Sequence, residues 1–327
     1  MPANLPPNYF EAEKRYRAAK APGEKLAALE DMLRIMPKHK GTDHLQADLK
    51  SRIAKLKREP AKKGPSRGPS FIIPAEGAGQ VALVGPANCG KSSLVALLTK
   101  AQPEVADYPH TTLKPTPGMM AFEDITFQLL DLPPVSEDYN EPWLWENIKR
   151  ADLVWVVLSG ASPLSQLEKT QAILADNKIG LLRALTEPQA DLEAGWNYLE
   201  ALLVITGLDL PDTAEHIDIF KELIDEPWPL AAVSSVTGQG LAELGRMTFE
   251  ALDIIRVYTK QPGKPPDLGQ PFTLNRGATV LDLASKIHKE VAAKMKRARV
   301  WGSGAFEGQI VQQGHVLADK DVVEISF

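Results

Sequence analysis

A short glycine-rich stretch between two apolar runs constrains this chain more than any other feature of its sequence. Residues 85–92, Gly-Pro-Ala-Asn-Cys-Gly-Lys-Ser, follow the apolar run at 81–84 and precede a helical pattern that begins near Ser92. A loop at the start of a helix points its backbone N–H groups inward, and the positive end of the helix dipole attracts phosphate oxygens. The pattern therefore predicts a phosphate-binding loop between a strand and a helix, rather than a mere glycine-rich turn.

Each residue type in this loop suits one part of a nucleotide and its metal. Lys91 would reach the β- and γ-phosphates, and the Ser92 hydroxyl would bind Mg²⁺ while Ser93 begins the helix. Asp131, at the end of the later strand pattern 125–131, would hold the same Mg²⁺ through water, and a solvated strand-end aspartate is the alternative. The candidate nucleotide-binding residues of the loop are Gly85, Asn88, Cys89, Gly90, Lys91, Ser92 and Ser93. Cys89 is expected to pack, because no base is paired with it in the sequence.

The chain around the loop divides into three parts, as its 327 residues allow. Residues 1–70 show helical spacing followed by a basic stretch rich in proline and glycine, which predicts a helical region and a basic linker. Residues 71–253 alternate short apolar strands with amphipathic helices, which is typical of a parallel sheet covered on both faces. Residues 254–327 predict a small α+β domain with several strands around one helix, which would span residues 279–296.

Composition limits the cellular location and the partners that we expect for this chain. The single cysteine cannot form an internal disulfide, and no apolar run approaches the roughly 20 residues that span a bilayer. We therefore expect a cytoplasmic protein with no membrane partner. The net charge of -5 gives no general affinity for nucleic acid, so any such binding needs a local basic patch.

Other segments resemble a known family. The run from Ala106 to Gly118, A-D-Y-P-H-T-T-L-K-P-T-P-G, resembles the first switch of the Obg-like translation-factor GTPases. Residues 38–45 and the helical pattern after them are similar to the N-terminal helical region of the developmentally regulated GTP-binding proteins, the DRG branch. Residues 255–260, 287–289, 300–302 and 321–323 are similar to the TGS domain of that branch. The resemblance implies an α/β P-loop NTPase G domain with an N-terminal helical region and a C-terminal ubiquitin-like β-grasp TGS domain.

The resemblance also implies an activity. Such a protein would bind GTP and GDP and hydrolyse GTP by in-line attack of water on the γ-phosphate. Thr112 would coordinate Mg²⁺ when the γ-phosphate is present, with Thr111 as the alternative. Lys91 and Thr112 are thus the candidate catalytic residues, and Ser92, Thr112 and Asp131 are the candidate metal ligands.

Recognition of guanine is implied at two further positions. The family carries Asn-Lys-x-Asp after a strand, and here the sequence is Thr206-Gly207-Leu208-Asp209. Asp209 would accept from the N1 and N2 hydrogens of guanine, which disfavours an ATPase. Loss of the asparagine and lysine predicts weaker base binding. The backbone N–H of Ser235, in a later strand-to-helix turn, would meet the guanine O6.

The second switch departs from the family pattern. The sequence Asp131-Leu132-Pro133-Pro134 has proline where the family has a glycine whose N–H reaches the γ-phosphate. Val135 stands where some GTPases place a water-orienting side chain. Slow unassisted hydrolysis is expected, and the alternative is a nucleotide-binding adaptor with little or no hydrolysis. Trp143 and Trp145, further along, are expected to pack in the core rather than to anchor a partner.

Two hypotheses concern ions and partners. In related GTPases, an asparagine at the position of Asn88 accompanies K⁺ binding. An asparagine also tolerates an unusual backbone angle in a tight loop, so both interpretations stay open. Six basic residues of the tail could join the basic linker in contacting a ribosome or RNA, although a solvated face is the alternative. These residues are Lys286, Lys289, Lys294, Lys296, Arg297 and Arg299.

Overall fold

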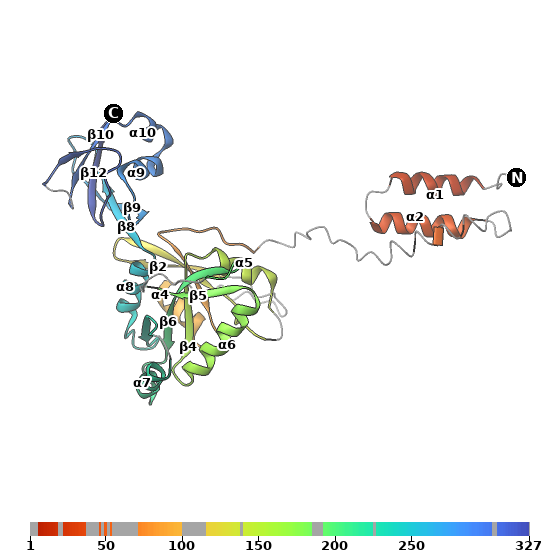
Figure 1. Ribbon diagram of the computed structural model, residues 1–327, viewed down its shortest axis with the longest axis horizontal. Coiled ribbons are helices and arrows are strands. Elements are labelled where there is room, and N and C mark those ends of the chain that lie inside the picture. The colour runs from red at the N-terminus through yellow and green to blue at the C-terminus, as the bar shows by residue number, and fades with distance from the viewer. Residues whose placement is uncertain are drawn as a thin grey trace. The chain divides into compact units, whose positions relative to one another are not determined.

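The chain divides into two compact units, Met1–Ser70 and Phe71–Phe327 (Figure 1). The computed structural model describes residues 6–18, 22–36, 46, 49–50, 53, 71–99, 116–137, 140–184, 192–224, 227–302 and 306–326. In the first unit, helices α1 (Pro7–Ala18) and α2 (Pro22–Ile35) bury an apolar cluster that includes Tyr9, Leu29 and Met32. The basic linker and residues 38–45 lie outside the described residues.

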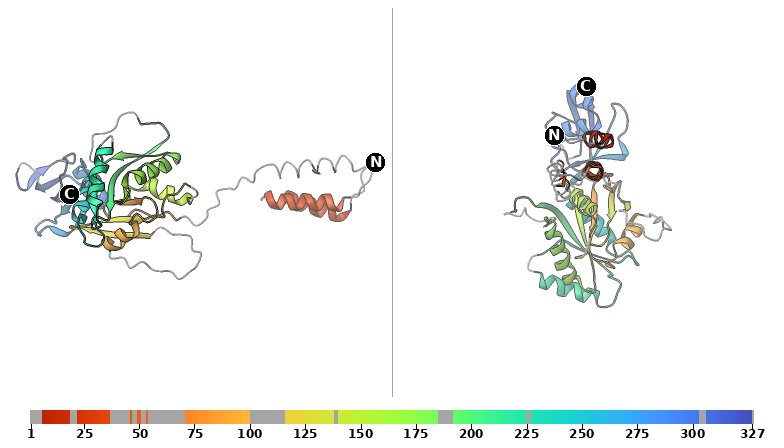
Figure 2. Two further views of the ribbon diagram at one scale, coloured as in Figure 1. Left: turned by 90° about the horizontal axis from the view of Figure 1, so that it is seen from below. Right: turned by 90° about the vertical axis from the view of Figure 1, so that its right-hand side faces the viewer.

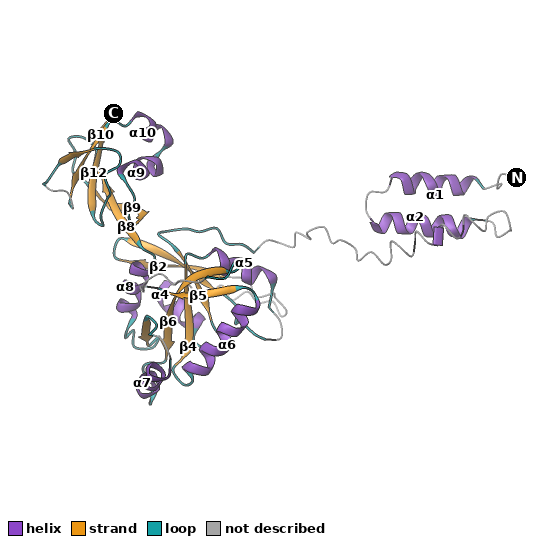
Figure 3. Ribbon diagram, viewed as in Figure 1, coloured by secondary structure: helices purple, strands orange, loops and turns teal. Residues whose placement is uncertain are grey.

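A seven-stranded, mostly parallel sheet forms the first part of the second unit (Figure 3). Its strands are β1 (Gln80–Val84), β2 (Thr116–Phe122), β3 (Ile125–Asp131), β4 (Leu153–Ser159), β5 (Ile179–Arg183), β6 (Asn197–Thr206) and β7 (Leu230–Val233). Their order is β2-β3-β1-β4-β6-β5, and β7 also pairs with β6. β2 runs antiparallel to β3, whereas the other pairs are parallel. The predicted parallel sheet is confirmed.

Helices cover both faces of this sheet, which is why its central strands are continuous apolar runs. The helices are α4 (Lys91–Thr99), α5 (Pro142–Arg150), α6 (Pro163–Asp176), α7 (Thr213–Leu223) and α8 (Leu241–Ala251). Leu94 of α4 and Leu244 of α8 belong to one core cluster, with Trp155 of β4. Leu144 of α5 and residues of α6 and α7 belong to the other. Figure 2 shows the sheet between its helices from two further directions.

The end of the second unit has a five-stranded sheet and its own core. The elements are β8 (Ile254–Thr259), β9 (Asp267–Asn275), α9 (Val280–Ile287), α10 (Lys289–Lys294), β10 (Arg297–Trp301), β11 (Gln309–Val311) and β12 (Asp321–Ser326). The strand order is β11-β10-β12-β8-β9, and β12 and β8 are parallel. The small α+β fold is confirmed, but two helices replace the one expected at 279–296. His288 has an extended backbone, and its ring accepts from the Glu290 N–H as the cap of α10.

Strand β8 is buried on both faces because it joins the two parts of this unit. Ile255 and Val257 point into the core of the second sheet, whereas Ile254 belongs to a core cluster of the first. Arg256, between Ile255 and Val257 in the strand, is 3% exposed, and its guanidinium lies 4.7 Å from the centre of the Phe249 ring.

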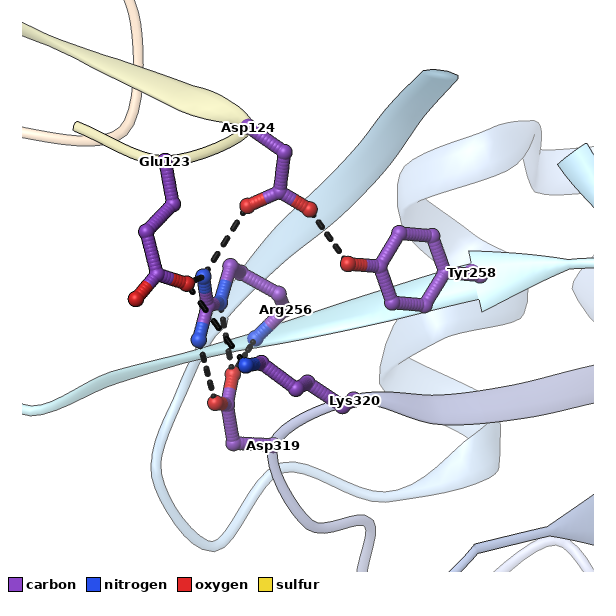
Figure 4. Close-up of polar contacts among 6 residues, drawn as sticks. All are labelled: Glu123, Asp124, Arg256, Tyr258, Asp319 and Lys320. Atoms are coloured by element: carbon purple, nitrogen blue, oxygen red, sulfur yellow. Dashed lines mark hydrogen bonds and ion pairs between the residues drawn. The ribbon is translucent and has the colours of Figure 1, made fainter. Parts of the chain in front are cut away.

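The Arg256 side chain ties the β2–β3 turn to the second sheet, as Figure 4 shows. It donates to Asp319 at 3.0 and 2.7 Å, to Asp124 at 2.9 Å, and to Glu123. The hydrogen bond from Arg256 lowers the pKa of Glu123. Burial would raise the pKa of Asp124 and of Asp319, but the hydrogen bonds from Arg256, and from Tyr258 to Asp124, outweigh it and lower both. Burial and the bond to Asp124 raise the pKa of Tyr258 to about 12.

Within the described residues, the helices are all too short or too polar to cross a membrane.

Candidate functional site

The loop between β1 and α4 has the backbone that its glycines predict. Asn88 and Gly90 adopt left-handed conformations, with φ of 60° and 92°. A Cβ on Gly85 would lie 2.2 Å from the Val157 carbonyl oxygen, and one on Gly90 would lie 3.1 Å from the Thr206 hydroxyl. Gly85 has no room for a side chain, and the positive φ of Gly90 disfavours one, so the two glycines let the loop pack closely against the end of the sheet.

Lys91 lies inside the curl of this loop. The side chain is buried, and its ammonium donates to the carbonyl oxygens of Gly85 at 2.9 Å and Pro86 at 2.8 Å. Its Nζ is 3.6 Å from the Sγ of Cys89, a buried thiol whose pKa is raised mainly by burial. The loop therefore holds a cation at the N-terminal end of α4, where an anionic ligand is also favoured by the helix dipole.

Asp131 and Ser92 meet beside this cation. Burial raises the pKa of Asp131 above its usual value, while a hydrogen bond from Ser92 and the charge of Lys91 act in the opposite direction. A carboxylate next to a hydroxyl offers the oxygen ligands that Mg²⁺ prefers, with water and phosphate completing its shell. The residues present thus fit the expected metal ion.

An open pocket of about 390 Å³ lies over the loop and the segment after Asp131. Its lining includes Asn88, Cys89, Gly90, Lys91, Ser92, Ser93 and Asp131, together with Pro133 and Pro134. The structure therefore brings together all but one of the candidate residues of the loop, and Gly85 lies beneath them as an acceptor for Lys91. Thr111 and Thr112 lie outside the described residues.

The segment after Asp131 is fixed against the loop. Leu132 and Val135 are buried in the core, and the Val135 N–H donates to the Gly85 carbonyl at 3.2 Å. Ser136 and Asn140 close a local turn through two hydrogen bonds of 3.0 and 2.6 Å. The first amide after the two prolines therefore already has a partner within the protein. Trp143 and Trp145 pack against the same core, as expected.

The candidate guanine-recognition residues lie at the ends of β6 and β7. Asp209 is exposed, and its Oδ1 accepts from the Ser234 hydroxyl at 2.5 Å. Ser234 accepts in turn from the N–H groups of Val236 at 3.2 Å and Thr237 at 3.0 Å. The sequence drew attention to Ser235, but the neighbouring buried side chain is the one that orients Asp209.

Thr206 has a role that the sequence comparison did not suggest. Its hydroxyl donates to the Cys89 carbonyl at 2.7 Å and also lies 3.3 Å from the Leu158 carbonyl. Thr206 thus connects the end of β6 to the phosphate loop. Replacing the asparagine of the family pattern by threonine therefore removes an amide but supplies this contact. No local pattern reveals the contact between Thr206 and Cys89, because the two residues are 117 positions apart in the sequence.

The basic residues of the tail lie on α9, α10 and β10, and Lys296 lies in the segment between α10 and β10. Lys286 of α9 donates to the Thr273 carbonyl, and Lys294 of α10 pairs with Glu290 at 3.3 Å. Arg297 and Arg299 are exposed on β10. They make no ion pair within the described part of the chain. Lys289 and Lys296 are likewise exposed and make no ion pair with a described residue, so these two lysines and the two arginines are available for an anionic partner.

Comparisons with known proteins agree with this architecture. A family model described as 50S ribosome-binding GTPase matches residues 80–186, and a TGS domain model matches residues 255–326. The chain is similar to the developmentally-regulated G-protein 3 of Arabidopsis thaliana, with 29% identity over 92% of this chain and 98% of the relative. It is 25% identical to the ribosome-interacting GTPase 1 of Saccharomyces cerevisiae, again over 92% and 98%. The GTP-binding protein 1 of Schizosaccharomyces pombe is also 25% identical, with the same coverage.

Among solved structures, the G domain of the T. maritima FeoB iron transporter covers 53% of this chain and 97% of its own, with 28% identity and a TM-score of 0.38. The family models and the relatives confirm the predicted resemblance to the DRG branch and the presence of a GTPase domain and a TGS domain. They favour a GTPase over a nucleotide-binding adaptor.

Proposed function

We propose that this chain, a GTP-binding protein that joins a P-loop GTPase domain to a C-terminal TGS domain, is a slow switch that acts with a ribosome or RNA. The observation that carries the proposal is the pocket in which Lys91, Ser92 and Asp131 meet at the start of α4. The parts would be a helical region and basic linker at 1–70, the G domain at 71–253 and the TGS domain at 254–327.

The phosphates would lie on the loop amides, with the Lys91 ammonium turned from the Gly85 and Pro86 carbonyls onto the β- and γ-phosphates. The Ser92 hydroxyl and, through water, Asp131 would hold Mg²⁺, joined by Thr112 when the γ-phosphate is present. The metal would neutralise charge that develops on the phosphate oxygens. Lys91 and Thr112 would then place the γ-phosphate for in-line attack by water.

Guanine would be read by Asp209 and by the backbone N–H of Ser235. The hydrogen bond from Ser234 orients the Asp209 carboxylate, whose two oxygens keep acceptor positions for the N1 and N2 hydrogens of the base. Thr206 would support base binding indirectly, because its hydrogen bond to Cys89 holds the phosphate loop next to the segment that carries Asp209.

Hydrolysis would be slow without a partner for a structural reason. Pro133 and Pro134 line the pocket but carry no N–H, and the following amide, of Val135, is bonded to Gly85. The segment therefore offers the γ-phosphate no new donor in this arrangement. Nor does it supply a side chain that orients water at Val135, which is buried.

A potassium ion beside Asn88 is part of the proposal. Asn88 is exposed, lines the pocket and has a left-handed backbone conformation, so both interpretations of this residue are compatible with its position. A K⁺ ion there would add positive charge near the β- and γ-phosphates. Equal single-turnover rates in KCl and NaCl would exclude this role.

The partner follows from the relatives and from the surface of the TGS domain. One relative is named a ribosome-interacting GTPase, and Arg297 and Arg299 are exposed on β10. Phosphate groups of RNA are the natural partners of such arginines. A ribosomal partner would place the protein in the cytoplasm.

Single-turnover release of phosphate from GTP, with and without ribosomes, tests this function. We expect slow release alone, faster release with ribosomes, and loss of both in Lys91→Ala. Lys264→Ala, on an exposed turn of the TGS domain, is the matched control. Absence of phosphate release under both conditions would favour the adaptor.

A further inference from the structure

A groove of about 300 Å³ between α6 and α7 leaves large apolar side chains uncovered. Ile219 and Leu223 of α7 are 45% and 58% exposed, while Phe220 between them is buried in the core and forms part of the lining. Leu164 of α6 is partly covered and lies on the other side of the groove. The two helices are neighbours in the fold (Figure 1). Neighbouring exposed apolar side chains rimmed by polar residues mark a candidate interaction site.

The spacing of these side chains suits a helix. Ile219 and Leu223 are four residues apart, so they lie one above the other on the same face of α7. An amphipathic helix that lies in a groove presents its own apolar residues at the same spacing. A helix is therefore the element whose side chains interdigitate best with this surface.

The charges around the groove select a basic helix. Glu168 lines the groove from α6, and Glu215 and Glu222 flank Ile219 on α7; all three are exposed. They make no ion pair with any residue that the structure describes. Lys221 pairs with Asp218, and it lies about 200° around α7 from Ile219, away from the groove. Glu168 is thus the charged residue of the lining, Glu215 and Glu222 extend the acidic surface along α7, and Lys169 of α6 is not part of the lining.

A continuous set of hydrogen bonds joins the groove to the phosphate loop. His216, in the groove, has its Nδ1 2.9 Å from the Gly160 carbonyl oxygen. The Gly160 N–H donates to the Thr206 carbonyl at 2.9 Å, and the Thr206 hydroxyl donates to Cys89 at 2.7 Å. The packing is tight, because a Cβ on Gly160 would lie 2.4 Å from Thr213 of α7. A shift of α7 would therefore change the position of the phosphate loop.

We propose that this groove binds a basic amphipathic helix of a partner protein and that binding changes the rate at which the nucleotide leaves. The second half of the proposal rests on the proposed GTP-binding function. The first half does not, because docking is measured without nucleotide.

Docking is tested with a fluorescein-labelled 18-residue helical peptide that carries leucines at i and i+4 and lysines on both flanks. Titration with the full-length chain is followed by anisotropy. Ile219→Ser with Leu223→Ser should weaken binding at least about tenfold, the effect of a few buried anchor side chains. Leu268→Ser with Ile310→Ser removes two comparably exposed side chains from the TGS domain and should change nothing.

Charge is tested separately. Glu215→Gln with Glu222→Gln should weaken binding and reduce its dependence on salt, because two charges of this acidic surface are removed. A peptide with glutamate in place of lysine should not bind. Equal binding of the two peptides, or equal loss in the groove and TGS variants, would overturn the proposal. A shift from dimer to monomer on Ile219→Ser with Leu223→Ser would show instead that a second copy of the chain covers the groove.

Coupling is tested by release of a fluorescent GDP analogue. Saturating peptide should change the release rate of the full-length chain severalfold and leave that of the groove variant unchanged. An unchanged rate in both would overturn the coupling. If the analogue does not bind at all, the proposed function fails, whereas the peptide titration still decides the docking.

Discussion

Arg256→Met removes the cation that joins the β2–β3 turn to the TGS domain while keeping a side chain of similar length. The methionine side chain cannot donate to Asp124, Asp319 or Glu123, so these carboxylates lose the guanidinium that they share. Among the described residues, Asp124 keeps only the Tyr258 hydroxyl, Asp319 the backbone N–H of residue 256, and Glu123 the ammonium of Lys320. The contact of the guanidinium with the Phe249 ring is also lost. We therefore expect the variant to weaken the attachment of the TGS domain to the G domain.

The size of the effect follows from burial. Removing one partner of a buried ion pair costs about 3–5 kcal/mol. The Arg256 side chain is 4% exposed, but Asp124 and Asp319 are 24% and 28% exposed and can be partly rehydrated. Glu123 is 52% exposed and adds little. The lower end of the range, about 3 kcal/mol, is the expected loss in the free energy of unfolding.

Urea denaturation of the full-length chain measures this loss, and hydrogen exchange of the β8 amides shows where it occurs. Arg246→Met is the matched control, because Arg246 also contacts two carboxylates, Glu243 and Glu250, but is 53% exposed on α8. Its unfolding should barely change. Equal losses in the two variants, or unaltered exchange in β8 of Arg256→Met, would refute the role assigned to burial.

Three further outcomes are expected. The pKa values of Glu123, Asp124 and Asp319 are lowered in the folded protein. Their contribution to the free energy of unfolding is therefore fully present at a pH above their pKa values in the unfolded chain, and it is lost as the pH falls through their lowered pKa values in the folded protein. The stability difference between wild type and Arg256→Met should therefore shrink in acid, and a constant difference would contradict this. Thr206→Val removes the hydroxyl that holds the Cys89 carbonyl, so GTP affinity should fall about threefold to tenfold by calorimetry, against no change in Thr248→Val, which removes a buried hydroxyl that bonds within α8. The pKa of Asp131 is raised, so its carboxylate takes up a proton at a higher pH than an ordinary aspartate. As the pH falls, the Mg²⁺-dependent part of GTP affinity should therefore weaken earlier, and Asp131→Asn should abolish this dependence on pH.

The sequence predicted the elements whose signals are local. The phosphate loop carries its own pattern, and Asp131 ends an apolar strand that is parallel to the strand before the loop, so their proximity follows from the fold. The apolar pattern did not mark the bounds of β2 and β5. β2 contains Pro117 and Gly118, which are tolerated at an edge, and most of β5 is only partly buried.

Residues that act across long sequence separations were not predicted. Thr206 and Ser234 are common residue types, and only the fold brings them to Cys89 and Asp209. The break at His288 was also missed, because apolar spacing continues on both sides of it. Arg256 lies in a strand whose continuous burial is explained only when both neighbouring cores are seen.

Calorimetric titration of the full-length chain with GTP and with ATP, at millimolar Mg²⁺, tests the central claim most directly. Wild type should bind GTP more tightly than ATP, since adenine lacks the donor pair that Asp209 accepts, and Lys91→Ala should lose at least about tenfold in affinity for GTP. No uptake of GTP, tighter binding of ATP, or equal affinity in Lys91→Ala would contradict the account.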